Sequence, residues 1–141
     1  FIDAIATDHA PHAAEDKERD FESAAFGISG LETALGSVMA LVRRGDIDLN
    51  TMISKLTYEP AKAFPRIRAL AGGDIGTLKV GAPADVVIFD PDAEWTVDPA
   101  RFASKGRNTP LSGERLRGMV LATICGGEIV YKDDRVEVRS Q

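Results

Sequence analysis

The sequence predicts an α/β protein in two parts, a β/α unit followed by a small module of β-strands. A short apolar run opens the chain, helical periodicity dominates residues 30–71, and short runs rich in β-branched residues fill residues 72–141. Apolar residues at helical spacing indicate an amphipathic helix, whereas short β-branched runs between glycines and prolines indicate strands. The 141 residues suit one ordinary domain or two small ones.

The composition is that of a globular protein with a mildly acidic surface, 44% hydrophobic with a net charge of −5. Nucleic-acid binding would need clustered Lys and Arg, and a membrane helix needs about 18 consecutive apolar residues, so we expect neither partner. The chain shows no signal-peptide pattern, and its single cysteine fits a reducing compartment. We therefore expect a cytoplasmic protein, with Cys125 buried as a small apolar residue.

The first part begins as a strand that is already under way. Residues 1–7 (FIDAIAT) predict a buried strand, and the polar residues 8–29 predict a long loop with some helical turn. The chain lacks a starting Met, so we expect it to be the C-terminal piece of a longer protein. Because one strand with helices has no sheet to pack on, this part is interpreted as the last β/α unit of a larger parallel structure. In a (β/α)8 barrel, functional residues sit at the C-terminal ends of strands, where Asp8 lies.

Caps and prolines set the limits of the predicted helices. Ser29 and Glu32 have the spacing of a capping box before the first helix, and Gly45 suits its left-handed stop. A second helix is expected from near Asn50, with Pro60 marking a break or a new first turn.

The second part, residues 72–141, is predicted to be a β module. Residues 84–90 (ADVVIFD) form its clearest strand, and residues 99–105 suit a short helix. The apolar run that follows predicts a hairpin turning at the glycine pair 126–127. Residues 108–110 (NTP) are interpreted as a structural turn between the module and the first part.

Both histidines lie in one motif, Asp8-His9-Ala10-Pro11-His12. A strand-end carboxylate such as Asp8 can bind a divalent metal and accept a proton from metal-bound water, or it can simply be a cap or a solvated turn. His9 follows on an extended backbone and points away, which favours a packed or hydrogen-bonded histidine behind the site. His12 follows a proline turn that could return it to the site, where it could hold an anionic group or donate a neutral hydrogen bond.

The motifs TDHAPH, FGISGLETAL, PADVVIFDP, RNTP and ATICGGEIVY closely resemble the C-terminal part of the bacterial type I dihydroorotases. These enzymes belong to the metal-dependent amidohydrolase superfamily, and the resemblance covers essentially the whole chain. It implies a (β/α)8 barrel with a β domain built from segments before and after the barrel. Residues 1–71 would be the last β/α unit and terminal helices of the barrel, and residues 72–141 the C-terminal part of a small β-sandwich-like module.

The resemblance also implies an activity, the zinc-dependent reversible hydrolysis of dihydroorotate to N-carbamoyl-aspartate in pyrimidine biosynthesis. Asp8 is then a metal ligand and the general acid/base, and His12 holds the carboxylate of the substrate. Phe26 and Gly27 contact the pyrimidine ring through their backbone. The remaining ligands of a binuclear zinc centre are expected from earlier barrel strands, so we expect this chain alone to be inactive.

Two other functions stay open. The chain could belong to another cyclic amidohydrolase, an allantoinase or a hydantoinase, although the NTP element favours a dihydroorotase. It could also come from a non-catalytic dihydroorotase-like partner of aspartate transcarbamoylase, although the presence of both Asp8 and His12 favours an enzyme. The expected partners are a small-molecule substrate, the missing N-terminal barrel portion, and a second copy or aspartate transcarbamoylase.

Overall fold

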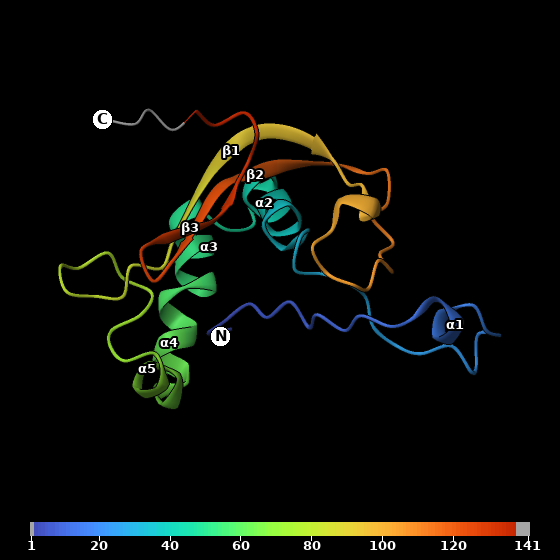
Figure 1. Ribbon diagram of the computed structural model, residues 1–141, viewed down its shortest axis with the longest axis horizontal. Helices are drawn as coiled ribbons and strands as arrows, with labels where there is room; N and C mark the ends of the chain where they lie inside the picture. Colours follow the sequence, from blue (N-terminus) through green and yellow to red (C-terminus); the bar gives the residue numbers. More distant parts are fainter. Residues whose placement is uncertain (1, 138–141) are drawn as a thin grey trace.

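The computed structural model describes residues 2–137, in which short helices come first and an antiparallel sheet follows (Figure 1). This arrangement confirms the α/β class. The elements, in chain order, are α1 (Ala14–Lys17), α2 (Ala34–Arg44), α3 (Leu49–Leu56), α4 (Tyr58–Ala63), α5 (Pro65–Leu70), β1 (Val86–Thr96), the 3-10 helix η1 (Pro99–Arg101), β2 (Arg115–Cys125) and β3 (Glu128–Lys132). Within the described part of the chain, no helix is long and apolar enough to cross a membrane.

Local signals set most helix ends. Gly45 ends α2 in the left-handed conformation, with φ of 79°, as predicted. The side chain of Asp48 accepts the N–H of Thr51 and so caps α3. A proline opens α5 at its first position, where its missing N–H costs nothing.

The predicted capping box of the first long helix is wrong. The helix begins at Ala34 after a turn, and its cap residue, Thr33, makes no side-chain capping bond. Ser29 instead donates its hydroxyl to the carbonyl of Gly106, 2.7 Å away, and Glu32 accepts the N–H of Ser104 at 2.8 Å. Both side chains therefore bond to a distant segment, which a local pattern cannot reveal.

The sheet has the order β1-β2-β3 and is antiparallel throughout. Gly126 and Gly127, with φ of 57° and 88°, form the turn between β2 and β3, so the predicted hairpin is confirmed. Cys125 ends β2 beside this turn and is exposed, so the prediction that it is buried is wrong. Its place at the strand end, next to the hairpin tip, leaves it uncovered.

The helix α2 packs directly on β2 (Figure 1), so the two predicted parts share one core. A methyl group on Gly118 of β2 would lie 2.6 Å from the side chain of Met39 in α2. A methyl group on Gly36 of α2 would lie 2.9 Å from the side chain of Leu116. Glycine at both positions lets the helix approach the strand closely. The buried apolar side chains of the described residues include Met39 of α2, Met119 and Ala122 of β2, and Val97 and Phe102.

The strand predicted over residues 1–7 is not formed in the described part, residues 2–7 (Phe1 lies outside it). The segment runs beside the α3–α4 region, where the N–H of Ile5 donates to the carbonyl of Lys55 at 3.0 Å (Figure 1). A parallel strand requires neighbouring strands for its hydrogen bonds, and residues 2–137 supply none here. An isolated parallel bridge between His9 and Ile28 is the nearest approach to such pairing.

Candidate active site

Asp8 has a backbone conformation that marks it out from the rest of the described chain. Its φ of 44° makes it the one non-glycine residue with positive φ among residues 2–137. Few residues other than glycine adopt this region, although aspartate tolerates it better than most, and such conformations cluster at functional sites. The side chain is exposed, and within the described residues its carboxylate has no hydrogen bond or ion pair. The carboxylate is therefore available to a ligand.

His9 lies behind Asp8 and is fully engaged by the protein. Its Nδ1 accepts the backbone N–H groups of Gly30 and Leu31, at 3.1 and 3.2 Å. Because Nδ1 accepts, the proton of the neutral ring is on Nε2, which donates to the hydroxyl of Ser104 at 3.2 Å. With both ring nitrogens used, His9 is a hydrogen-bonded histidine behind the site, as interpreted from the sequence, and has no nitrogen left for a metal.

Glu32 completes this hydrogen-bonded group. Its Oε1 accepts the N–H of Ser104, while its Oε2 is buried without a partner among the described residues. Partial burial by itself would raise the pKa of Glu32, but the hydrogen bonds from Ser104 outweigh it and bring the pKa below its usual value. Glu32 is therefore an ionised anchor for Ser104 and, through Ser104, for His9.

The structure brings together the three residues predicted to bind substrate. Nε2 of His12 donates to the backbone carbonyl of Phe26 at 2.5 Å. Gly27 has φ of 120°, and a methyl group there would lie 2.5 Å from Cβ of Ala10 and 3.2 Å from Nε2 of His12. Only glycine fits this corner, which we call the substrate corner and define as His12, Phe26 and Gly27. The ring of Phe26 is 88% exposed, so this residue contributes to the corner through its backbone.

A segment from the β module supports both sides of the site, and sequence reasoning missed it. This bracing segment, residues 104–108, alternates half-buried positions 104, 106 and 108 with exposed Lys105 and Arg107. Ser104 bonds to His9, and Asn108 bonds to the backbone of His12 and Gly27. Between them, a methyl group on Gly106 would lie 2.2 Å from Cβ of Pro11. The NTP element was therefore more than a turn, and the alternation of small or polar residues with basic ones was the signal that could have indicated it.

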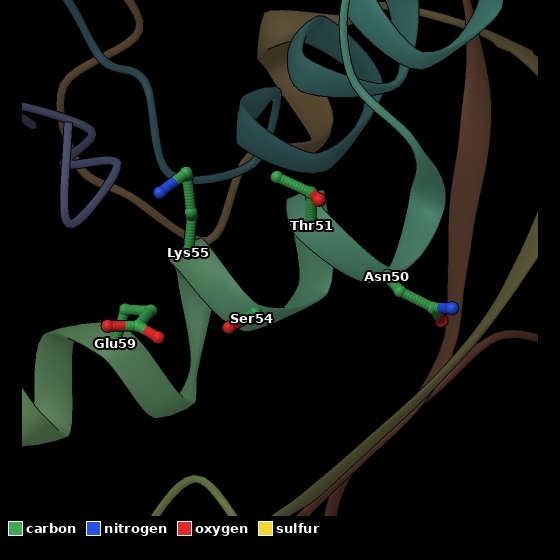
Figure 2. Close-up of a pocket in the computed structure, with 5 residues that line it drawn as sticks. All are labelled: Asn50, Thr51, Ser54, Lys55 and Glu59. Atoms are coloured by element: carbon green, nitrogen blue, oxygen red, sulfur yellow. The ribbon is translucent and has the colours of Figure 1, made fainter. Parts of the chain in front are cut away.

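The described residues form two surface hollows, of which one adjoins the site. Figure 2 shows the first, along α3 and the start of α4, with polar side chains around it: Asn50, Thr51, Ser54, Lys55 and Glu59. The second is lined by Lys17, Ile28, Asn108, Thr109 and Pro110, and so adjoins the substrate corner. Lys17 is held there by the carbonyls of Ala25 and Gly27, 2.7 and 3.2 Å from its Nζ.

A family model described as the amidohydrolase family matches residues 26–131. The chain belongs to the amidohydrolase family. The match spans α2 to β3 and includes Phe26, Gly27, Glu32 and the bracing segment.

The relatives of this amidohydrolase chain include proteins named dihydroorotase. That of Anaeromyxobacter dehalogenans (strain 2CP-1) is 50% identical over 136 residues, or 96% of this chain and 30% of the relative. That of Aquifex aeolicus is 48% identical over 132 residues, or 94% and 29%. The chain thus spans about 30% of the length of the curated relatives it matches.

Solved structures of hydantoinases share the fold of this amidohydrolase chain. The L-hydantoinase (dihydropyrimidinase) of Arthrobacter aurescens matches with a TM-score of 0.82 and 32% identity, over 96% of this chain and 30% of that one. The D-hydantoinase of a Thermus species matches with a TM-score of 0.76 and 25% identity, over 93% and 28%.

Proposed function

We propose that this chain is the C-terminal part of a dihydroorotase and supplies one corner of its active site. The observation that carries the proposal is the identity of 46–50% with proteins of that name over 94–96% of the chain. The reaction would be the reversible hydrolysis of the cyclic amide of dihydroorotate to N-carbamoyl-aspartate. In this reading residues 2–8 complete the last strand of a (β/α)8 barrel once neighbouring strands pair with them. The sheet of residues 86–132 would be part of a β-sandwich-like module.

The described residues fit one ligand of a metal centre and no more. Asp8 has a free, exposed carboxylate, whereas both ring nitrogens of His9 are used. Residues 2–137 contain no group of three or more His, Cys, Asp or Glu that could hold a metal. A catalytic zinc normally has three protein ligands, so the other ligands of a zinc centre would come from other barrel strands.

Asp8 would have two tasks in such a centre, as ligand and as proton carrier. A bound divalent metal supplies activated water at neutral pH. The carboxylate of Asp8 would take up the proton of that water and deliver it to the ring nitrogen that leaves when the amide opens. The backbone at φ 44° supports this role, because it turns the side chain at the end of the predicted strand in a fixed direction.

The substrate corner would bind the other end of the ring. The carboxylate of dihydroorotate would replace the carbonyl of Phe26 as the partner of Nε2 of His12, and a charge-assisted bond favours this exchange. The N–H of Gly27 belongs to the same peptide unit as the carbonyl of Phe26 and points the opposite way, so Nε2 of His12 is the donor of this corner that would meet the carboxylate. The corner is thus suited to an anionic cyclic amide.

A substrate panel tests the proposal. The complete enzyme, loaded with zinc, is assayed with dihydroorotate and with hydantoin and dihydrouracil, which lack the carboxylate. We expect turnover of dihydroorotate to exceed that of both neutral rings. Preference for a neutral ring would support a hydantoinase, in line with the 32% identity to the L-hydantoinase. Loss of all turnover, together with binding to aspartate transcarbamoylase, would support the non-catalytic partner.

A further inference from the structure

We propose that Asn108 is a positioning residue of the substrate corner, one that holds His12 and Gly27 in place from outside the loop that carries them. This inference rests on the proposed function, since its kinetic test needs ring hydrolysis. It assigns to the β module a direct part in substrate binding, although the module contributes no group that touches the reacting atoms.

The side-chain amide of Asn108 makes three bonds across a long sequence separation, one of them at 3.3 Å from the hydroxyl of Ser29 to Oδ1 of Asn108. Its Oδ1 accepts the backbone N–H of His12 at 3.2 Å, and its Nδ2 donates to the carbonyl of Gly27 at 3.0 Å. The backbone carbonyl of Asn108 accepts the N–H of Ser29 at 2.8 Å, which fixes the residue against the far end of the same loop. One amide therefore ties together two residues of the substrate corner that lie 15 positions apart in the sequence.

These bonds determine the direction of the groups that would face the substrate. Nε2 of His12 holds the carbonyl of Phe26, and Asn108 with Lys17 holds the carbonyl of Gly27. Because a peptide unit is planar and trans, a fixed Phe26 carbonyl also fixes the N–H of Gly27, which points the opposite way. When the substrate replaces the carbonyl of Phe26 as the hydrogen-bond partner of His12, the side chains of Asn108 and Lys17 still hold the carbonyl of Gly27 in place.

The two ends of the bracing segment act on different parts of the site. Ser104 bonds to His9, the neighbour of Asp8, whereas Asn108 bonds to His12, Gly27 and Ser29 and makes no bond to His9. Loss of the Asn108 amide should therefore disturb substrate binding and leave the metal ligand in place. A merely structural role would lower the amount of folded enzyme without separating KM from kcat.

The test uses the complete enzyme with the substitutions Asn108→Ala and Asn108→Asp. The aspartate keeps the acceptor for His12 and the shape of the side chain but removes the donor to Gly27. Asn50→Ala is the matched control, because it removes the same amide from an exposed position of α3 (Figure 2). The measurements are kcat and KM for dihydroorotate, zinc content, melting temperature, and amide hydrogen exchange of peptides covering residues 10–29.

For Asn108→Ala we expect KM to rise about tenfold or more, kcat to change much less, and zinc content to stay normal. Exchange in residues 10–29 should be faster in both Asn108 variants and unchanged in Asn50→Ala. A folded Asn108→Ala enzyme with normal KM and normal exchange overturns the positioning role. If the alanine variant does not fold, normal KM and normal exchange in Asn108→Asp overturn the positioning role. An unmodified enzyme that does not hydrolyse dihydroorotate refutes the proposed function instead, and the exchange measurement then decides the role of Asn108.

Discussion

The sheet of β1, β2 and β3 and the loop of residues 8–29 are built in contrasting ways. The sheet forms its own hydrogen-bond ladder, and a two-glycine turn sets the pairing of β2 with β3. The loop has one helical turn, α1, and its conformation depends on bonds from residues 77 to 96 positions away, such as Ser104 and Asn108. The pairing of β2 with β3 is thus set by residues next to each other in the sequence, whereas the conformation of the site loop depends on the distant bracing segment. Four substitutions test this contrast.

The largest effect is expected at the tip of the site itself, from Asp8→Asn in the complete enzyme. The amide cannot carry the proton and is a poorer metal ligand, so turnover should fall by several powers of ten. The melting temperature of the metal-free enzyme should hardly change, because the exposed carboxylate of Asp8 makes no bond within residues 2–137. Asp134→Asn, at an exposed turn, is the control. A variant that keeps more than about a tenth of the turnover would sink the role assigned to Asp8.

The next effect is expected from Gly27→Ala in the substrate corner. The new methyl group would lie 2.5 Å from Cβ of Ala10 at a φ of 120°, so the loop must shift. We expect kcat/KM to fall by about a hundredfold, mostly through KM. Gly81→Ala is the control, because Gly81 also has a positive φ, 87°, but an added methyl group there would have no atom within 4 Å. It therefore measures the effect of the backbone strain without the steric contact. Equal effects of the two substitutions on kcat/KM would mean that the substrate corner is not crowded.

In the sheet region, Gly118→Ala should reduce stability and leave the kinetics alone. Its methyl group would lie 2.6 Å from the side chain of Met39 and push α2 away from β2. The free energy of unfolding should fall by about 1–3 kcal/mol, while KM of the folded enzyme stays normal. Gly113→Ala, also at positive φ but with open space around it, is the control. Chemical denaturation and kinetics together make the measurement, and a large change in KM would mean that the sheet and the site are coupled.

The smallest effect is a pH dependence at Glu32. Its pKa is lower in the folded protein than in the unfolded chain, so its ionised form stabilises the fold above the ordinary glutamate pKa. This contribution is lost as the pH falls through the lowered pKa. Glu32→Gln should therefore be less stable than the unmodified enzyme at neutral pH, and the gap should close in acid. Melting temperatures of both proteins, measured from neutral to acid pH, test this prediction. A difference in melting temperature that widens toward low pH would contradict the stabilising role of ionised Glu32.

The sequence was most successful where a signal and its partner are close together. The hairpin at Gly126 and Gly127, the strand from Val86 and the helix stop at Gly45 were all predicted from a few neighbouring residues. Predictions failed where a side chain had a choice of partners. Ser29 and Glu32 had capping-box spacing, but both bond to the bracing segment instead. The strand predicted over residues 1–7 failed for a related reason, since a parallel strand depends on neighbours that a single run of residues cannot specify.

The sequence alone determined which chemical groups are present: Asp8, the two histidines of its motif and the glycine of the substrate corner. It also favoured a hydrogen-bonded His9 behind the site, although the extended backbone assumed for that prediction is absent at Asp8, whose φ is 44°. Only the tertiary structure decided that Asn108 reaches His12 and Gly27, and that the N–H groups of Gly30 and Leu31 fix the proton of His9 on Nε2. The physical reason is that hydrogen bonds have a short range in space but no fixed range along the chain. A contact between residues 96 positions apart exists only once the sheet, α2 and the loop have packed together.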